Sequence, residues 1–348
     1  MIGPGSGRFF EDFALGEMIE HATPRTVTVG DVALYQALYG SRFVLQSSAP
    51  FAKALGLHDA PVDDLLVFHT VFGKSVPDIS LNAVANLGYA EGKFIAPVYP
   101  GDTLRAHSEV IGLRETSNRK SGIVYVRTTG INQAGALVLS YVRWVMVNKK
   151  AETSPAPETH TPQLWEALSP EDLVPPHARF ERYKFDLAGA PYRLHDYAAG
   201  DKIDHVEGQT IEEAEHQLAT RLYQNAAKVH FNAHAQSTTR FAKRLVYGGH
   251  IISLARALSF NGLQNAVHIV GINAGTHVAP AFAGDTIYAW SEVLATANAH
   301  GRSDVGFVRL RTIATKNEPC GAFPCRGSDG SYPPSVILDL DYWVAVPR

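Results

Sequence analysis

The chain has 348 residues, of which 45% are hydrophobic, and this length predicts two domains with packed cores. A formal net charge of −3 argues against partners that need a strongly charged surface, such as nucleic acid or a membrane. The first residues lack the charged and apolar regions of a secretory signal, and no apolar run approaches the ~18 residues of a spanning helix. We therefore expect a cytoplasmic protein.

The sequence repeats itself at a nearly constant offset, which predicts two copies of one structural unit. The matching pairs are FALGEMIEH (13–21) with YAAGDKIDH (197–205), APVYPGDTLRAHSEV (96–110) with APAFAGDTIYAWSEV (279–293), and VRWVMV (142–147) with DYWVAV (341–346). The offsets are 197 − 13 = 184, 279 − 96 = 183 and 341 − 142 = 199. The larger last offset predicts an insertion at about 317–334, where Gly, Pro and Ser are typical of a loop.

The repeat divides the chain into an N-terminal copy at 1–150, a linker at 151–176 and a C-terminal copy at 177–348. Prolines and acidic residues in the linker indicate an exposed segment. The expected insertion contains Cys320 and Cys325, which are too few for a disulfide framework. Their spacing does not fit a zinc knuckle, and no nearby histidine completes a set of ligands, so we expect free thiols and no metal.

Each copy is expected to begin with an amphipathic helix. In the N-terminal copy Thr28 or Asp31 caps a helix that runs through Tyr39. In the C-terminal copy Thr210 and Glu213 have the spacing of a capping box, which predicts a helix that starts at Thr210.

A strongly apolar helix is expected next in each copy, around Phe68 in the first and over 251–258 in the second. Runs with alternating β-branched and aromatic residues follow, such as SGIVYVRTTGI at 121–131, and these predict antiparallel strands. A buried helix followed by several such strands fits an α+β class in which a sheet wraps around the helix.

The stretch 222–249 carries the residues best suited to chemistry. It reads NAAKVH at 225–230 and GG at 248–249, which resembles the D-x-N-P-aliphatic-H signature of the MaoC-like, hot-dog-fold hydratases. The histidine is kept, an asparagine replaces the aspartate, and the next two signature positions differ. The resemblance covers both copies apart from the linker and the insertion. It implies a double hot-dog fold, with two tandem antiparallel sheets that each wrap around a central helix.

The resemblance assigns catalytic roles to His230, Asn225 and Gly249. A histidine moves protons near neutral pH, whereas an amide holds a water but cannot take its proton. The free N–H groups of Gly249, and after it Gly248, would polarise a thioester oxygen at a helix start. Tyr223 is placed among the substrate-binding residues. The alternatives are a structural histidine, a turn-forming asparagine and close packing at the glycines.

At the matching positions the N-terminal copy has Ser41 for Asn225 and Gln46 for His230, while Asp64 and Leu65 replace the glycines. This copy is therefore expected to be catalytically silent and to bind the acyl group, with Gln46 among the binding residues. Arg42 is the cation in its loop, and we expect it to bind a carboxylate of the acyl chain.

The duplicated length, the silent first copy and the Asn-for-Asp loop resemble one branch of the family. That branch reversibly hydrates a methyl-branched, carboxylated enoyl-CoA, mesaconyl-CoA, to β-methylmalyl-CoA. The resemblance implies a hydro-lyase, a homodimer, an acyl-CoA thioester substrate and no cofactor beyond its CoA. A second proton-transfer group is not identified; Asp31, Asp63 and Glu215 are candidates. A hot-dog thioesterase that uses Asp64, or a non-catalytic acyl-CoA-binding protein, remains an alternative.

Overall fold

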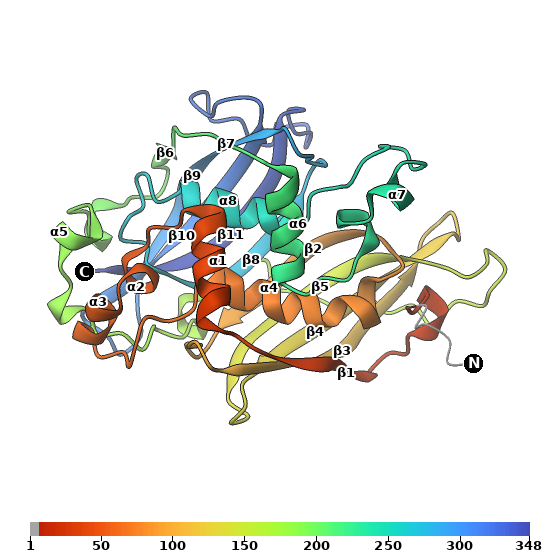
Figure 1. The fold of residues 1–348 in the computed structure, drawn as a ribbon, viewed down its shortest axis with the longest axis horizontal. Helices are drawn as coiled ribbons and strands as arrows, with labels where there is room; N and C mark the ends of the chain where they lie inside the picture. The colour runs from red at the N-terminus through yellow and green to blue at the C-terminus, as the bar shows by residue number, and fades with distance from the viewer. Residues whose placement is uncertain (1–6) are drawn as a thin grey trace.

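The computed structural model describes residues 7–348, which form one curved antiparallel sheet with the main helices in front of it (Figure 1). The strands are β1 (Met18–Thr26), β2 (Ala83–Phe94), β3 (Thr103–Glu115), β4 (Ser121–Ile131), β5 (Leu137–Asn148), β6 (Lys202–Asp204), β7 (Gln209–Thr210), β8 (His268–His277), β9 (Thr286–Asn298), β10 (Val305–Lys316) and β11 (Val336–Pro347). The helices are α1 (Val29–Tyr39), α2 (Val44–Ser47), α3 (Ala49–Ala54), α4 (Asp64–Ser75), α5 (Phe185–Ala188), α6 (Glu213–Leu222), α7 (Ala233–Gln236) and α8 (Gly248–Leu258). The expected α+β class is confirmed.

The two copies share one strand order. It runs β1-β3-β4-β5-β2 in the first copy and β6-β9-β10-β11-β8 in the second, and β2 pairs with β8 to join them. In that pair Ala90 lies opposite its own counterpart Ala274, since 274 − 90 = 184. The hydroxyls of Tyr39 and Tyr223, again 184 residues apart, hydrogen-bond at 2.6 Å. Residues that meet their own counterparts lie on a local twofold axis, so the copies are related by such an axis.

The two central helices are α4 and α8, which pack against the sheet. Every residue of α4 is buried, and in α8 every residue after Gly248 is buried. In α4 the rings of Phe68 and Phe72 lie among Tyr89 and Tyr141. Burying an apolar side chain of this size stabilises the fold by about 1.5–3 kcal/mol, which is why a helix with this many apolar residues is held at the centre.

The caps of α1 and α6 differ. Thr28 caps α1 as expected: its side chain accepts from the Asp31 N–H at 3.1 Å, and Asp31 accepts from the Thr28 N–H at 2.8 Å. The expected capping box of Thr210 and Glu213 is wrong. Thr210 lies in β7, where its hydroxyl bonds β9, and α6 instead has Glu212 as its N-cap, at the counterpart of Thr28 (212 − 28 = 184).

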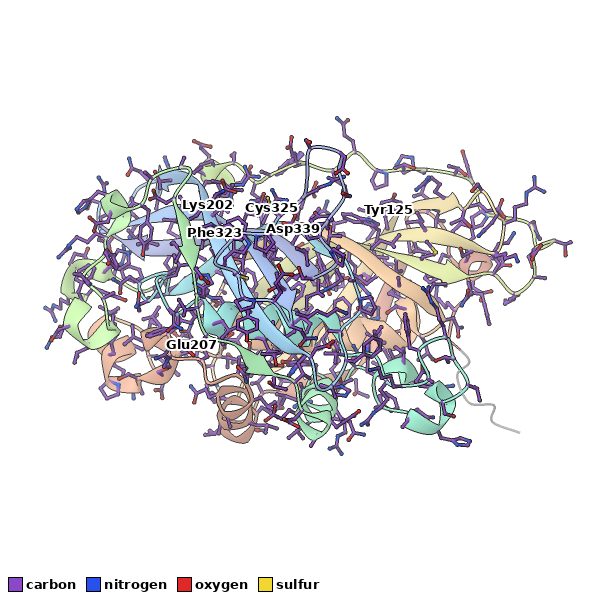
Figure 2. The ribbon with its side chains drawn as sticks, turned by 90° about the horizontal axis from the view of Figure 1, so that it is seen from above. Tyr125, Lys202, Glu207, Phe323, Cys325 and Asp339 are labelled. Carbon is purple, nitrogen blue, oxygen red and sulfur yellow. The ribbon has the colours of Figure 1, made fainter. Side chains whose placement is uncertain are left out.

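The late insertion lies between β10 and β11, as expected, where the first copy has a tight turn between β4 and β5. Its Phe323 ring packs edge-on against Trp290, with centroids 5.2 Å apart. Figure 2 shows Phe323 and Cys325 beside Lys202, whose Nζ lies 5.7 Å from the Phe323 ring centroid. Both cysteines are free, although Cys320 is buried. The insertion therefore covers one outer part of the sheet.

No helix within residues 7–348 is long and apolar enough to cross a bilayer.

The polar residues buried in the sheet repeat between the two copies. His21 bonds Ser108 at 2.7 Å in the first copy, and His205 bonds Ser291 at 2.8 Å in the second. The duplication therefore extends to hydrogen bonds inside the core.

We predict that stability falls as the pH is lowered from about 7.5 to about 5, because buried histidines resist protonation. Burial lowers the pKa of several histidines: to about 3 for His69 and His250, and to about 4 for His205, His230 and His277. In the unfolded chain they titrate near ~6.5, so that chain takes up protons first as the pH falls. Their contribution is complete above about pH 6.5 and is lost towards pH 4, by up to about 2 kcal/mol per histidine at pH 5.

Urea unfolding at several pH values in this range measures the loss as a fall in the free energy of unfolding. Replacing His205, which lies outside the cavity described below, should reduce the slope of stability against pH. A free energy of unfolding that stays constant between about pH 7 and pH 5 would contradict the prediction.

Candidate active site

A cavity of about 360 Å³ opens between the two copies. The N-terminal copy contributes Phe72 of α4, Tyr89 of β2 and Arg143 of β5 to its wall. The C-terminal copy contributes His230, His277 of β8 and the first residue of α8. The site therefore belongs to both copies, and neither copy encloses it alone.

His230 ends a short 3-10 turn, Lys228–His230, and lines the cavity. Its Nδ1 lies 2.9 Å from the carbonyl oxygen of Leu245. A carbonyl only accepts, so Nδ1 carries the proton and the neutral ring keeps an unprotonated Nε2. Burial lowers the pKa of His230 to about 4, so the ring is neutral near pH 7. His230 therefore presents an unprotonated Nε2, held by the Leu245 contact in the tautomer that can accept a proton.

Asn225 lines the same cavity and is almost fully buried. Its Oδ1 accepts a hydrogen bond from the N–H of Ala227 at 3.0 Å. This contact fixes the orientation of the amide, with Oδ1 towards the Ala227 N–H. The other end of the amide, the donor group Nδ2, takes no part in this contact. Asn225 thus combines the turn-forming role with a donor group beside His230.

The two glycines at the start of α8 have different positions. Gly248 lines the cavity, where an added Cβ would overlap the ring of His277. Gly249 is buried behind it and does not line the cavity, and an added Cβ there would overlap Tyr247. The N-cap Tyr247 makes no side-chain cap, so the first N–H groups of α8 are not satisfied by a side chain. The sequence placed Gly249 first, whereas the structure brings Gly248 to the cavity.

Three expected binding residues lie away from the cavity. Arg42 is exposed and donates to Asn261 at 2.8 Å. Buried Gln46 donates at 3.3 Å to the carbonyl oxygen of Val267 in the C-terminal copy, and Tyr223 bonds Tyr39 on the twofold axis. The three residues do not share this cavity with His230, so their contact with the substrate stays a prediction.

Sequence reasoning missed Arg143, His277 and Tyr89. The Nε2 of His277 lies 3.2 Å from the Tyr89 hydroxyl, and burial lowers the pKa of His277 to about 4. No spacing in the sequence singles out His277 or Tyr89. Arg143 had a signal: it alternates with the buried Tyr141 and Val145 on β5, where a charged residue is unusual.

A second hollow, of about 30 Å³, is the counterpart of the cavity in the other copy. It is lined by Asp64 and Phe94 at the positions of Gly248 and His277 (248 − 64 = 184; 277 − 94 = 183). The Asp64 carboxylate in its wall pairs with His268 Nδ1 at 2.7 Å. Of these two hollows, the cavity beside His230 is the one with the volume for an acyl group.

None of the candidate carboxylates lines the cavity. Asp31 caps α1, Asp63 caps α4 through the N–H of Leu65 at 2.9 Å, and Glu215 lies on α6. Among residues 7–348 no Asp or Glu lines the cavity. Nor does any group of three or more His, Cys, Asp or Glu in this described range form a metal site.

Comparison with known proteins shows to which family the chain belongs. The family model for mesaconyl-CoA hydratase matches residues 4–324. The chain is 60% identical over 343 residues to a β-methylmalyl-CoA dehydratase of Chloroflexus aurantiacus, covering 98% of this chain and 97% of that protein. It is also 60% identical over 346 residues to a mesaconyl-CoA hydratase of Cereibacter sphaeroides, covering 99% of each.

Two solved structures share the fold. A putative MaoC domain protein dehydratase from Chloroflexus aurantiacus J-10-fl has a TM-score of 0.98 and 59% identity, covering 100% of this chain and 99% of that one. Rv0216 of Mycobacterium tuberculosis, described as a double hot-dog fold, has a TM-score of 0.79 at 23% identity, covering 98% and 99%. The fold is therefore the double hot-dog of MaoC-like dehydratases. The chain belongs to the mesaconyl-CoA hydratase family and is a hydro-lyase.

We predict that Gly73→Ala displaces the loop that carries Asn225 and His230. Helix α4 of the N-terminal copy passes so close to this loop that a Cβ on Gly73 would overlap the Tyr223 carbonyl oxygen and crowd the Asn225 N–H. A shift of ~1 Å in a reacting group costs on the order of 100-fold in rate, so we expect hydration to fall more than about tenfold.

Gly30→Ala is the matched control, because Gly30 is exposed on α1 and a Cβ there meets its nearest atom at 3.5 Å. Steady-state hydration rates and circular dichroism of both variants provide the test. A Gly73→Ala protein that is folded and as active as the parent would show that the loop does not depend on this contact.

Proposed function

We propose that the protein reversibly hydrates mesaconyl-CoA to β-methylmalyl-CoA in the cavity between its copies. The observation that carries the proposal is His230, a neutral histidine whose tautomer is fixed by the Leu245 carbonyl. It faces the same cavity as the Asn225 amide. The names of the two relatives at 60% identity support this choice of substrate and product.

Water is held between the two side chains. The Nδ2 of Asn225 donates to the water oxygen, and the Nε2 of His230 accepts one of its protons. As the water oxygen bonds to the β-carbon of the enoyl group, the O–H bond breaks and its proton moves to Nε2. The positive charge on His230 then remains beside the developing enolate and stabilises it.

The electron pair of the double bond moves onto the thioester oxygen as an enolate. The N–H of Gly248, at the start of α8, carries partial positive charge and donates to this oxygen, and the N–H of Gly249 behind it adds to the positive potential of the helix start. His230 then returns its proton to the α-carbon on the same face. One group carries both proton movements because no Asp or Glu among the described residues lines the cavity. In the reverse direction His230 protonates the departing hydroxyl.

The proposal needs no cofactor, because every step uses side chains, backbone N–H groups and the thioester that the substrate's own CoA supplies. We retain a homodimer and a cytoplasmic location as part of it. The thioesterase alternative loses support from Asp64, whose carboxylate is held by His268 and by the N–H of Ile269 at 2.8 Å. That carboxylate has no free access to a substrate water.

Incubation of the full chain with mesaconyl-CoA tests the function. The absorbance of the conjugated thioester should fall without release of free thiol, and β-methylmalyl-CoA should appear by mass spectrometry. Release of thiol would show a thioesterase, and an unchanged spectrum with measurable binding would show a non-catalytic binding protein. Either result would overturn the proposal.

His230→Ala should lower the hydration rate by about 10²–10⁴-fold, because a positioned acid–base group contributes this much. His234→Ala removes an imidazole from the exposed helix α7 four residues away and should leave the rate within about threefold of the parent. Rate measurements on both variants, with circular dichroism to confirm folding, separate the two roles. Equal rates for the two variants would remove His230 from the mechanism.

A further inference from the structure

The substrate of the proposed reaction carries a free carboxylate on the carbon that receives the hydroxyl. This carboxylate must therefore enter the same cavity as His230. A buried carboxylate needs a cation and hydrogen-bond donors, because leaving it unpaired in the interior is unfavourable. Arg42, the cation expected from the sequence, is exposed and outside the cavity, so another group must meet it.

Arg143 is a buried cation in the cavity wall. It has no exposed surface, and its hydrogen bonds go only to hydroxyls: Nη2 donates to Ser75 at 2.8 Å and Nη1 to Ser80 at 3.3 Å. Its guanidinium carbon lies 4.3 Å from the ring centroid of Phe72. The Nε–H is buried and has no hydrogen-bond partner among the described residues. The side chain is thus held rigidly with a donor unused.

The charge of Arg143 has no counter-ion in the cavity. No carboxylate of residues 7–348 lines the cavity or hydrogen-bonds to this guanidinium. Lys149, another buried cation of the N-terminal copy, pairs with Glu115, whereas Arg143 forms no ion pair with a described residue. A fixed, desolvated cation that faces a cavity is a site for an anion.

Asn86 gives a second, independent observation. It lies on β2 and lines the same cavity, and both its Nδ2 and its Oδ1 are buried without a hydrogen-bond partner among the described residues. Buried amides are nearly always hydrogen-bonded, so this one points to a ligand that supplies the missing partner. Its Nδ2–H₂ offers donors to the second oxygen of a carboxylate.

We propose that Arg143, with the amide of Asn86, binds the free carboxylate of the substrate and selects enoyl-CoA thioesters that carry a carboxylate on the β-carbon. This inference rests on the proposed function and names the residue that determines its substrate class. Both side chains come from the N-terminal copy, whereas His230 and Asn225 come from the C-terminal copy. The β-carbon is held between them, with its carboxylate on one wall and the water on the other.

Equilibrium binding tests the inference without relying on turnover. Succinyl-CoA and butyryl-CoA have saturated four-carbon chains that end in a carboxylate and in a methyl group. By calorimetry on the full chain, the parent should bind succinyl-CoA more tightly. Arg143→Gln should weaken succinyl-CoA by about 10- to 100-fold, the loss of a charge-assisted hydrogen bond, and butyryl-CoA by less than about threefold. Arg143→Lys, which keeps the charge, should restore part of the difference.

Arg105→Gln is the matched control, since it removes an exposed guanidinium of β3 outside the cavity and should change neither affinity. If Arg143→Gln does not fold, Asn86→Ala replaces it, because Asn86 has no protein hydrogen bond to lose. We expect Asn86→Ala to weaken succinyl-CoA by about three- to tenfold and to leave butyryl-CoA unchanged. An unselective loss, or none, in this variant would overturn the inference.

The outcomes separate this inference from the proposed function. If the parent hydrates mesaconyl-CoA but Arg143→Gln weakens both ligands equally, Arg143 is structural and the inference fails while the function stands. The opposite outcome is that the parent does not hydrate mesaconyl-CoA, yet prefers succinyl-CoA, and that the Arg143→Gln variant lacks this preference. In that case the carboxylate site stands and the proposed function fails. The kcat/KM of each variant for mesaconyl-CoA and for crotonyl-CoA should change in the same way as its affinity for succinyl-CoA and for butyryl-CoA, respectively.

Discussion

The antiparallel pairing of β2 with β8 holds the two copies together, and the rest of the site depends on it. Because Ala90 meets Ala274 on a local twofold axis, the pairing creates two equivalent clefts between a central helix and the strands of the other copy. The paired side chains of Asp64 and His268 line the smaller cleft, while Gly248, without a side chain, lines the larger one. A symmetric scaffold has thereby become an asymmetric one through a few side chains.

The open cleft uses the two copies for different purposes. The C-terminal copy supplies the neutral His230 and the Asn225 donor, and the N-terminal copy supplies Arg143. Gly73 of α4 lets the N-terminal helix approach the loop that carries Asn225. The N-terminal copy has Gln46 where the C-terminal copy has His230, yet it closes the cavity and contributes the cavity's only lysine or arginine within the described residues. The N-terminal copy is therefore needed to form the wall of this cavity, not to carry out a second reaction.

The repeat offset predicts most of the fold, because local patterns and their duplication are written along the chain. It also leads to His230 and Asn225, whose spacing lies within one loop. The offset does not predict the role of Arg143, because the cavity that this residue lines is formed by segments far apart in sequence. The alternation of buried residues on β5 marks Arg143 only as an unusual charged residue. The predicted cap at Thr210 is wrong for a related reason. Thr210 has the spacing of an N-cap, but its hydroxyl forms a hydrogen bond with a neighbouring strand. The offset of 184 leads from Thr28 to Glu212, which is the observed N-cap.

Charge explains why an asparagine suits position 225 in the proposed reaction. The bound substrate brings one carboxylate, and Arg143 balances it, so the filled cavity is neutral while His230 is uncharged. An aspartate beside His230 would add an unpaired anion next to the substrate carboxylate and oppose binding. The Ala227 N–H holds Oδ1 and turns the donor face of Asn225 towards the water, which a carboxylate could not offer. The single base must then carry both proton movements, and its Nε2 is free to do so because Nδ1 carries the tautomer's proton and donates it to the Leu245 carbonyl.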